Sequence, residues 1–222
     1  MAWNYGDLKT EISKEVDDDT TDALTVIGQL INDVCEDIWY YATWSFRSTS
    51  TQFNSVSGTA SYDLSSEISD LNKILTVGYK GENDTEFRLI REIDMQTYNA
   101  ISSDTNTSTP SRFAYYNNNL LLDPIPNYSG TNNIEVYYDK IFTTLSSDSD
   151  VPEIPSKYKR VVKSGVKTLF WNYDDDLRET IEERRYKGGL GWMMENDMDR
   201  TIPPQSGKLI VAGTPRSRRY NR

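Results

Sequence analysis

The hydrophobic periodicity of this chain changes twice along its length, and these changes constrain the fold more than any other feature. Leu8, Ile12 and Val16 recur at steps of four, and a longer run with steps of three and four follows, as in amphipathic helices. Over residues 48–142, β-favouring runs separated by turn residues replace this spacing. Helical spacing returns after Pro155. The order predicts an α+β fold: a helical bundle from N- and C-terminal helices, with a β-rich, sandwich- or barrel-like insertion and an extended C-terminal arm.

These changes divide the chain into four expected parts: N-terminal helices over 1–47, the β-rich insertion over 48–145, C-terminal helices over 146–200 and the arm over 201–222. Asn4 is the expected cap of the first helix, and Thr21 or Asp22 opens the second. The insertion is expected to contain strands at Thr49 to Val56, Thr59 to Leu64, Ile74 to Lys80, Glu86 to Ile90, Arg112 to Asn117, Leu120 to Asp123 and Ile134 to Ile141.

Turn residues separate the expected strands. Gly58, Gly81 and the asparagine-rich stretches 117–119 and 127–133 are typical of turns. Within the insertion, residues 92–101 predict a short helix and residues 102–110 a polar loop.

Two further helices are expected after the insertion. Pro155 suits a first helical turn, and an apolar stripe runs from Tyr158 to Tyr173. A charged segment, Leu177 to Met198, follows and contains three glycines: Gly188, Gly189 and Gly191. Each weakens a helix by about 1 kcal/mol relative to alanine. We therefore predict a hinge or a site of close packing at these glycines.

The residue types present disfavour familiar catalytic chemistry. The chain has no histidine, which removes the commonest general base and metal ligand. Cys35 is the only cysteine, and its place on an apolar helical face indicates a core residue. Three acidic clusters, 17–19, 174–176 and Asp148 with Asp150, match no calcium-loop pattern; the first two lie where helices are expected to start or stop, so solvated caps are expected rather than ion sites. We predict no catalytic, cofactor-binding or metal-binding residue.

Basic charge is concentrated at the C-terminal end. Residues 207–222 contain five bases and no acid, although the chain has a net charge of −10, so the preceding residues have a net charge of −15. This arm has too few apolar groups to fold alone. Leu209, Ile210 and Val211 form a short β-like run, and Tyr220 is a possible aromatic anchor, which together suit addition to a partner's surface. A solvated, disordered end is the alternative.

Short motifs follow one another along the chain: Gly6-Asp7-Leu8, a helix ending in Trp39, Tyr40 and Trp44, Tyr62-Asp63-Leu64, Pro110, Phe113-Ala114-Tyr115, Leu120 to Pro126, Tyr137-Tyr138 and Ile154-Pro155 with Tyr158. With these motifs in this order, the chain resembles the head-to-tail adaptor proteins of tailed bacteriophages over about residues 5–198. Ser65 stands where the family's Tyr-Asp-Leu-Pro motif has proline, and Thr109 precedes Pro110 in the stretch similar to its Gly-x-Pro. Both departures fall in expected turns.

The resemblance implies a structural virion protein, not an enzyme, with no cofactor. Such proteins form a twelvefold ring that joins the portal protein to tail components such as a nozzle, tail tube or stopper, and DNA passes through the lumen without specific binding. Assembly in the bacterial host cytoplasm, a final place at the capsid-tail junction and no membrane partner are expected. The arm would reach the portal, so the expected portal-binding residues are Lys208, Leu209, Ile210, Val211, Arg216, Arg218, Arg219, Tyr220 and Arg222.

Two other functions remain open from sequence. The β-rich insertion suits a binding module for a glycan or another virion protein. An unrecognised enzyme is the third reading, since carboxylates distant in sequence can converge in space.

Overall fold

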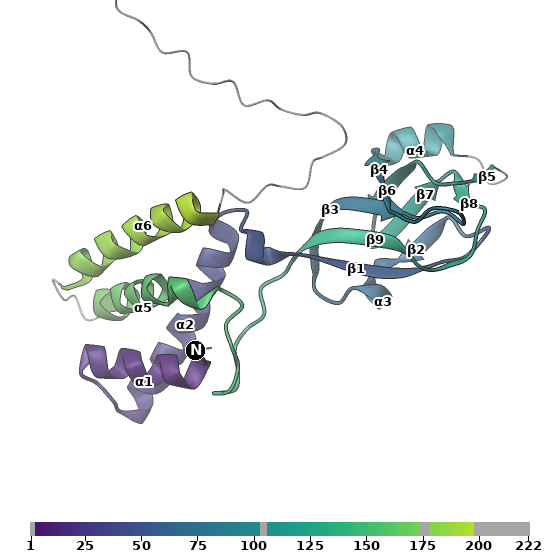
Figure 1. Cartoon of the computed structure of the whole chain (residues 1–222). Helices are drawn as coiled ribbons and strands as arrows, with labels where there is room; N and C mark the ends of the chain where they lie inside the picture. The colour runs from purple at the N-terminus through teal and green to yellow at the C-terminus, as the bar shows by residue number, and fades with distance from the viewer. Residues whose placement is uncertain (1–2, 103–105, 174–177, 198–222) are drawn as a thin grey trace, which may run out of the picture.

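The structure, a computed structural model, describes residues 3–102, 106–173 and 178–197. Within these residues, four long helices gather at one end of the molecule and a curled sheet forms the other end (Figure 1). The helices are α1 (Tyr5–Val16), α2 (Thr21–Tyr41), α5 (Lys159–Tyr173) and α6 (Arg178–Asp197). Both ends of the chain therefore supply the helical bundle, and the predicted α+β class is confirmed.

The first two helices begin at side-chain caps. Asn4 caps α1 by accepting a hydrogen bond from the Asp7 amide, as predicted. The cap of α2 is Thr20, whose hydroxyl accepts from the Ala23 amide at 3.2 Å. The helix itself begins at Thr21, one of the two predicted openings, and Thr20 has the extended backbone that lets its hydroxyl reach the first turn.

The strands of the middle part are β1 (Ser48–Ser55), β2 (Ser61–Asp63), β3 (Leu71–Tyr79), β4 (Arg88–Glu92), β5 (Thr107–Ser108), β6 (Arg112–Tyr116), β7 (Asn119–Asp123), β8 (Ile125–Pro126) and β9 (Gly130–Lys140). Short helices α3 (Leu64–Glu67) and α4 (Met95–Ile101) lie among them, and single 3₁₀ turns, η1 (Ser45–Arg47) and η2 (Ser156–Tyr158), precede β1 and α5.

Seven of the described strands pair in the order β1-β9-β3-β4-β6-β7-β2. The β4–β6 pair is parallel and the other neighbours are antiparallel, while β5 and β8 form a separate parallel pair. The sheet curls into a half-barrel (Figure 1). The ring centroids of Phe53 on β1 and Tyr62 on β2 lie 5.9 Å apart, so the two edge strands approach each other. The barrel-like prediction is confirmed.

Two parts of the strand prediction were wrong. β9 begins at Gly130, inside the predicted turn 127–133. Asn133 is buried there, and its side-chain amide donates to Ser55 Oγ at 2.7 Å while its Oδ1 accepts from the Ser55 amide, so a turn-forming residue type is satisfied within a strand. β5 lies in the predicted polar loop 102–110 because it pairs with β8, a contact that local sequence does not reveal.

The buried apolar residues of the described chain form two clusters. One joins α1, α2, α5 and α6 and has Ile31, Val34 and Val162 at its centre. The other fills the inside of the curled sheet and includes Phe113 and Val136. Leu145, at the end of the predicted insertion, packs in the helical cluster.

A buried arginine joins the two clusters at η1. Arg47 Nη1 donates to the carbonyl oxygens of Trp39 at 2.8 Å and Ala42 at 3.1 Å. Its Nη2 lies 3.9 Å from Asp139 Oδ2 on β9, and Ser48 donates to the same carboxylate at 2.7 Å. The end of α2 and the strands β1 and β9 are therefore tied together by buried polar contacts.

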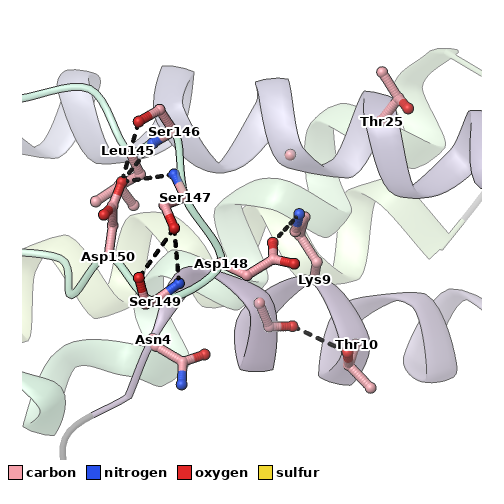
Figure 2. A network of polar contacts seen from close by, with 12 residues as sticks. Asn4, Lys9, Thr10, Thr25, Leu145, Ser146, Ser147, Asp148, Ser149 and Asp150 are labelled. Atoms are coloured by element: carbon pink, nitrogen blue, oxygen red, sulfur yellow. Dashed lines mark hydrogen bonds and ion pairs between the residues drawn. The ribbon is translucent and has the colours of Figure 1, made fainter.

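A loop after β9 holds the start of α1. The amides of Tyr5 and Gly6 donate to the carbonyl oxygens of Asp150, at 2.8 Å, and Asp148, at 3.0 Å. Lys9 Nζ lies 2.5 Å from Asp148 Oδ1. Figure 2 shows this ion pair. A Cβ on Gly6 would lie 2.9 Å from Asp148 Cβ, so only glycine allows this close approach. No helix in the described part of the chain is long and apolar enough to cross a membrane.

Candidate functional site

The predicted portal-binding residues, Lys208, Leu209, Ile210, Val211, Arg216, Arg218, Arg219, Tyr220 and Arg222, lie outside the described residues. The three predicted hinge glycines are described, and α6 continues through all of them. A Cβ on Gly189 would lie 2.8 Å from Val161 Cγ2 on α5, whereas Gly188 and Gly191 face open space. Gly189 is thus a site of close helix packing, and a hinge at the three glycines stays a prediction.

An ion-pair ladder runs across α1, α5 and α6, and its members are Glu11, Glu15, Lys159, Lys163, Lys167, Glu182 and Arg185. The lysines stand four residues apart, as do Glu11 and Glu15, so each set lies on one face of its helix. Acidic and basic side chains alternate along the contact between the helices. The ladder therefore fixes the register of α1 and α6 against α5.

Distances along the ladder are those of close ion pairs. Lys159 Nζ lies 2.5 Å from Glu11 Oε1, and Lys163 lies 3.3 Å from the other oxygen of that carboxylate. Lys167 Nζ lies 3.0 Å from Glu15 Oε2 and 3.3 Å from Glu182 Oε1. Lys163 also pairs with Glu15, and Arg185 pairs with Glu182.

The ladder shifts the pKa values of its carboxylates. The hydrogen bond from Lys159 lowers the pKa of Glu11 below its ordinary value. Burial raises the pKa of Glu182, but the hydrogen bond from Ser164, the charge of Lys167 and the hydrogen bonds from Arg185 and Lys167 together outweigh burial, and the net shift is downward. The folded ladder therefore favours ionised carboxylates.

Beside the ladder, α5 and α6 enclose an open groove of about 350 Å³, which we call the α5–α6 groove; its lining residues are Lys157, Arg160, Val161, Ser164, Arg185, Gly189 and Trp192. Trp192 is 45% exposed, and its ring and that of Tyr158 make a T-shaped contact with centroids 5.4 Å apart. In the described part of the chain, Lys157 and Arg160 form no ion pair with a carboxylate. The groove thus combines an open aromatic ring with two uncompensated cations, and tryptophan and arginine are residues enriched at protein interfaces.

Comparison with known families decides the identity of the chain. The family model for the SU10 adaptor protein matches residues 3–207. The chain belongs to the SU10 adaptor protein family. This match makes the chain a bacteriophage adaptor, a structural component of the virion, and it confirms the resemblance found in the sequence. No curated protein matches the chain.

The adaptor has a second basic segment that the sequence prediction missed. Residues 156–173 contain five bases, Lys157, Lys159, Arg160, Lys163 and Lys167, and no acid. In a chain of net charge −10 this segment was a visible signal. The tertiary structure adds what the sequence lacks, namely that three of these bases pair within the ladder and two face the groove.

The cysteine and the acidic cluster at Asp148 and Asp150 make contacts within the fold. Cys35 is fully buried in the helical core, and burial raises the pKa of its thiol to about 12. Asp150 Oδ2 accepts from the amides of Ser147 and Ser146, both at 2.7 Å, and these bonds lower the pKa of Asp150 (Figure 2). Over the described ranges, no group of three or more Cys, Asp or Glu is placed to hold a metal ion. The cluster 174–176 lies outside those ranges.

Proposed function

We propose that this adaptor forms a ring, with twelve subunits, beneath the portal protein, and that the ring connects the capsid to tail components while DNA passes through its lumen. The observation that carries the proposal is the family match, because it spans both the helices and the curled sheet. The ion-pair ladder and the buried contacts of Arg47 support a rigid subunit, which suits a load-bearing joint.

The basic C-terminal arm is the part that we propose binds the portal. Ordering fifteen residues, 208–222, costs on the order of 15–30 kcal/mol of backbone entropy. Exposed ion pairs contribute about 0–1 kcal/mol each, so five bases alone do not hold such an arm. Many arms on one ring raise the effective concentration of each at its site, and weak contacts then combine into a firm joint.

Charge supports the passage of DNA. Residues 15–46, which include all of α2, contain eight acids and no base. DNA binding depends on lysine and arginine displacing counterions from phosphates, so an acidic surface does not retain the genome. We propose that the acidic body of the ring lets DNA slide through the lumen.

Removal of residues 208–222 tests the proposal. The truncated adaptor is expected to fold normally, because these residues follow α6, but to lose most of its affinity for the portal protein. The measurement is co-sedimentation with purified portal, followed by electron microscopy of the complex. A matched variant that keeps the arm and replaces its five bases with glutamine separates the contribution of charge from that of the chain. Full portal binding by the truncated adaptor would contradict the role of the arm.

A further inference from the structure

The helices carry charge of opposite sign on separate faces. α2 has four acids, Asp22, Asp33, Glu36 and Asp37, and no base, whereas residues 156–173 have five bases and no acid. Three of those bases are paired within the ladder. In the described residues, none of the four acids of α2 forms an ion pair, and neither do Lys157 and Arg160. Each subunit therefore presents unpaired charge of both signs.

Three of the four exposed acids of α2 belong to one straight row, which we call the α2 stripe: Asp22, Val26, Gln29, Asp33, Glu36 and Tyr40. Its members follow at steps of three and four, so they share one face of the helix. The buried residues Ile27, Ile31 and Ile38 lie on the opposite face. The stripe also exposes two large apolar side chains, Val26 at 42% and Tyr40 at 48%. It is about 27 Å long, given a rise of 1.5 Å per residue.

The α5–α6 groove faces away from α2. Gly165 marks the side of α5 that touches α2, since a Cβ there would lie 2.7 Å from Val34 Cγ1. Val162, which is fully buried in the same cluster, lies near that side. Arg160 and Ser164 are two residues from Val162 on either side, and 100° per residue turns both about 160–200° away from it. A subunit's own α2 stripe therefore cannot enter its own groove.

We infer that the α5–α6 groove binds the α2 stripe of a second copy of this chain. The inference rests on the proposed function, because a ring requires a joint between subunits, and it identifies the two faces of that joint. Lys157 and Arg160 oppose Asp33 and Glu36, and Trp192 meets the exposed apolar residues of the stripe. Because the two faces differ, the contact is head-to-tail and repeats from subunit to subunit, as a closed ring demands.

Charge reversal on each face tests the inference. One variant of the full chain carries Lys157→Glu and Arg160→Glu, and another carries Asp33→Lys and Glu36→Lys; all four side chains are exposed. Like charges facing each other are expected to weaken self-association by roughly 100-fold or more. Ring formation, with portal present where the free protein stays monomeric, is measured by native mass spectrometry and electron microscopy.

Mixing the two variants gives the sharpest outcome. In a ring where the two variants alternate, every contact joins either two original faces or two reversed faces, so rings are expected to return. The matched controls are Lys73→Glu with Arg91→Glu and Glu67→Lys with Glu82→Lys, which reverse exposed charges on the curled sheet and its loops. These controls are expected to assemble as the original chain does.

The remaining outcomes separate the inference from the proposed function. Rings from both single-face variants at the original yield would overturn the inference and leave the connector function standing. Loss of portal binding with intact rings in the groove variant would assign the groove to the portal and also overturn the inference. Failure of the original chain to form any ring with portal would overturn both.

Discussion

Replacing the three glycines of α6 one at a time by alanine is expected to give opposite results within four residues of one helix. At Gly188 and Gly191 a new Cβ meets no heavy atom within 4 Å, so only helix propensity changes and each variant is expected to gain about 1 kcal/mol. At Gly189 the Cβ would lie 2.8 Å and 3.0 Å from the two methyl carbons of Val161. Carbon atoms prefer separations of about 3.5–4.0 Å.

Val161 has little freedom to move away, because β-branched side chains in helices strongly favour one rotamer. Overpacking of this kind costs about 1–3 kcal/mol, and the propensity gain offsets about 1 kcal/mol of it. Gly189→Ala is therefore expected to lose about 0–2 kcal/mol. The same substitution in a Val161→Ala background is expected to recover the gain of about 1 kcal/mol, since the clashing methyl groups are gone.

Urea unfolding followed by tryptophan fluorescence measures the change in the free energy of unfolding of the helical bundle. The five tryptophans are Trp3, Trp39, Trp44, Trp171 and Trp192, all outside the strands, so their emission reports the helical bundle. A change of 1 kcal/mol shifts the midpoint by about 0.3–1 M urea. Equal effects at Gly188 and Gly189, or no rescue by Val161→Ala, would refute the packing argument.

The hinge prediction is tested by ring assembly. The Gly188→Ala, Gly191→Ala double variant has a stiffer helix and should assemble poorly, and normal rings from it would contradict a hinge at these glycines.

Three further predictions follow from buried contacts and charge. Arg47→Met leaves the buried Asp139 carboxylate without its cation and is expected to lose about 3–5 kcal/mol of stability in the same urea assay. The control Arg88→Met, where the arginine is exposed, should lose about 0–1 kcal/mol. Equal losses would contradict the role of Arg47 in joining α2 to the sheet. Gly6→Ala should lose about 1–3 kcal/mol through its clash with Asp148, and no loss would show that the loop yields freely. The lowered pKa values of the ladder glutamates stabilise the fold at pH values above the unfolded pKa of 4.5, and this contribution is lost as pH falls through the folded pKa values. Acid titration should therefore weaken the helical bundle. Substitution of Glu11 by glutamine should make the free energy of unfolding depend less on pH in this range.

The helices were predicted well because apolar spacing and helix caps depend only on residues that are close in the sequence. The apolar steps around Ile12, Val34 and Val162 mark the faces that pack together, and Asn4 has the side chain that a first turn needs. These features depend on residues within one or two turns of each other. The order of helix, strand and helix then followed, and with it the fold class.

Pairing between distant segments was the part that sequence did not reveal. β5 exists only because β8 lies beside it, and Asn133 is a strand residue only because Ser55 and Lys80 satisfy its amide. The α5–α6 groove was missed for the same reason. Its basic segment is plain in the sequence, but which lysines are neutralised depends on where α1 and α6 lie.

The boundaries of the insertion at 47/48 and 145/146 remain predictions. Leu145 packs with the helical cluster, whereas Phe53 and Val136 belong to the sheet cluster. Tyrosine near-ultraviolet circular dichroism compared with tryptophan fluorescence tests whether the two clusters unfold separately.

Electron cryomicroscopy of the adaptor bound to its portal protein tests the central claim most directly. The account predicts a twelve-subunit adaptor ring beneath the portal, with residues 208–222 of each subunit lying against it. An adaptor that attaches to the portal singly, without contact between copies, or a ring whose arms touch no portal subunit, would contradict the account.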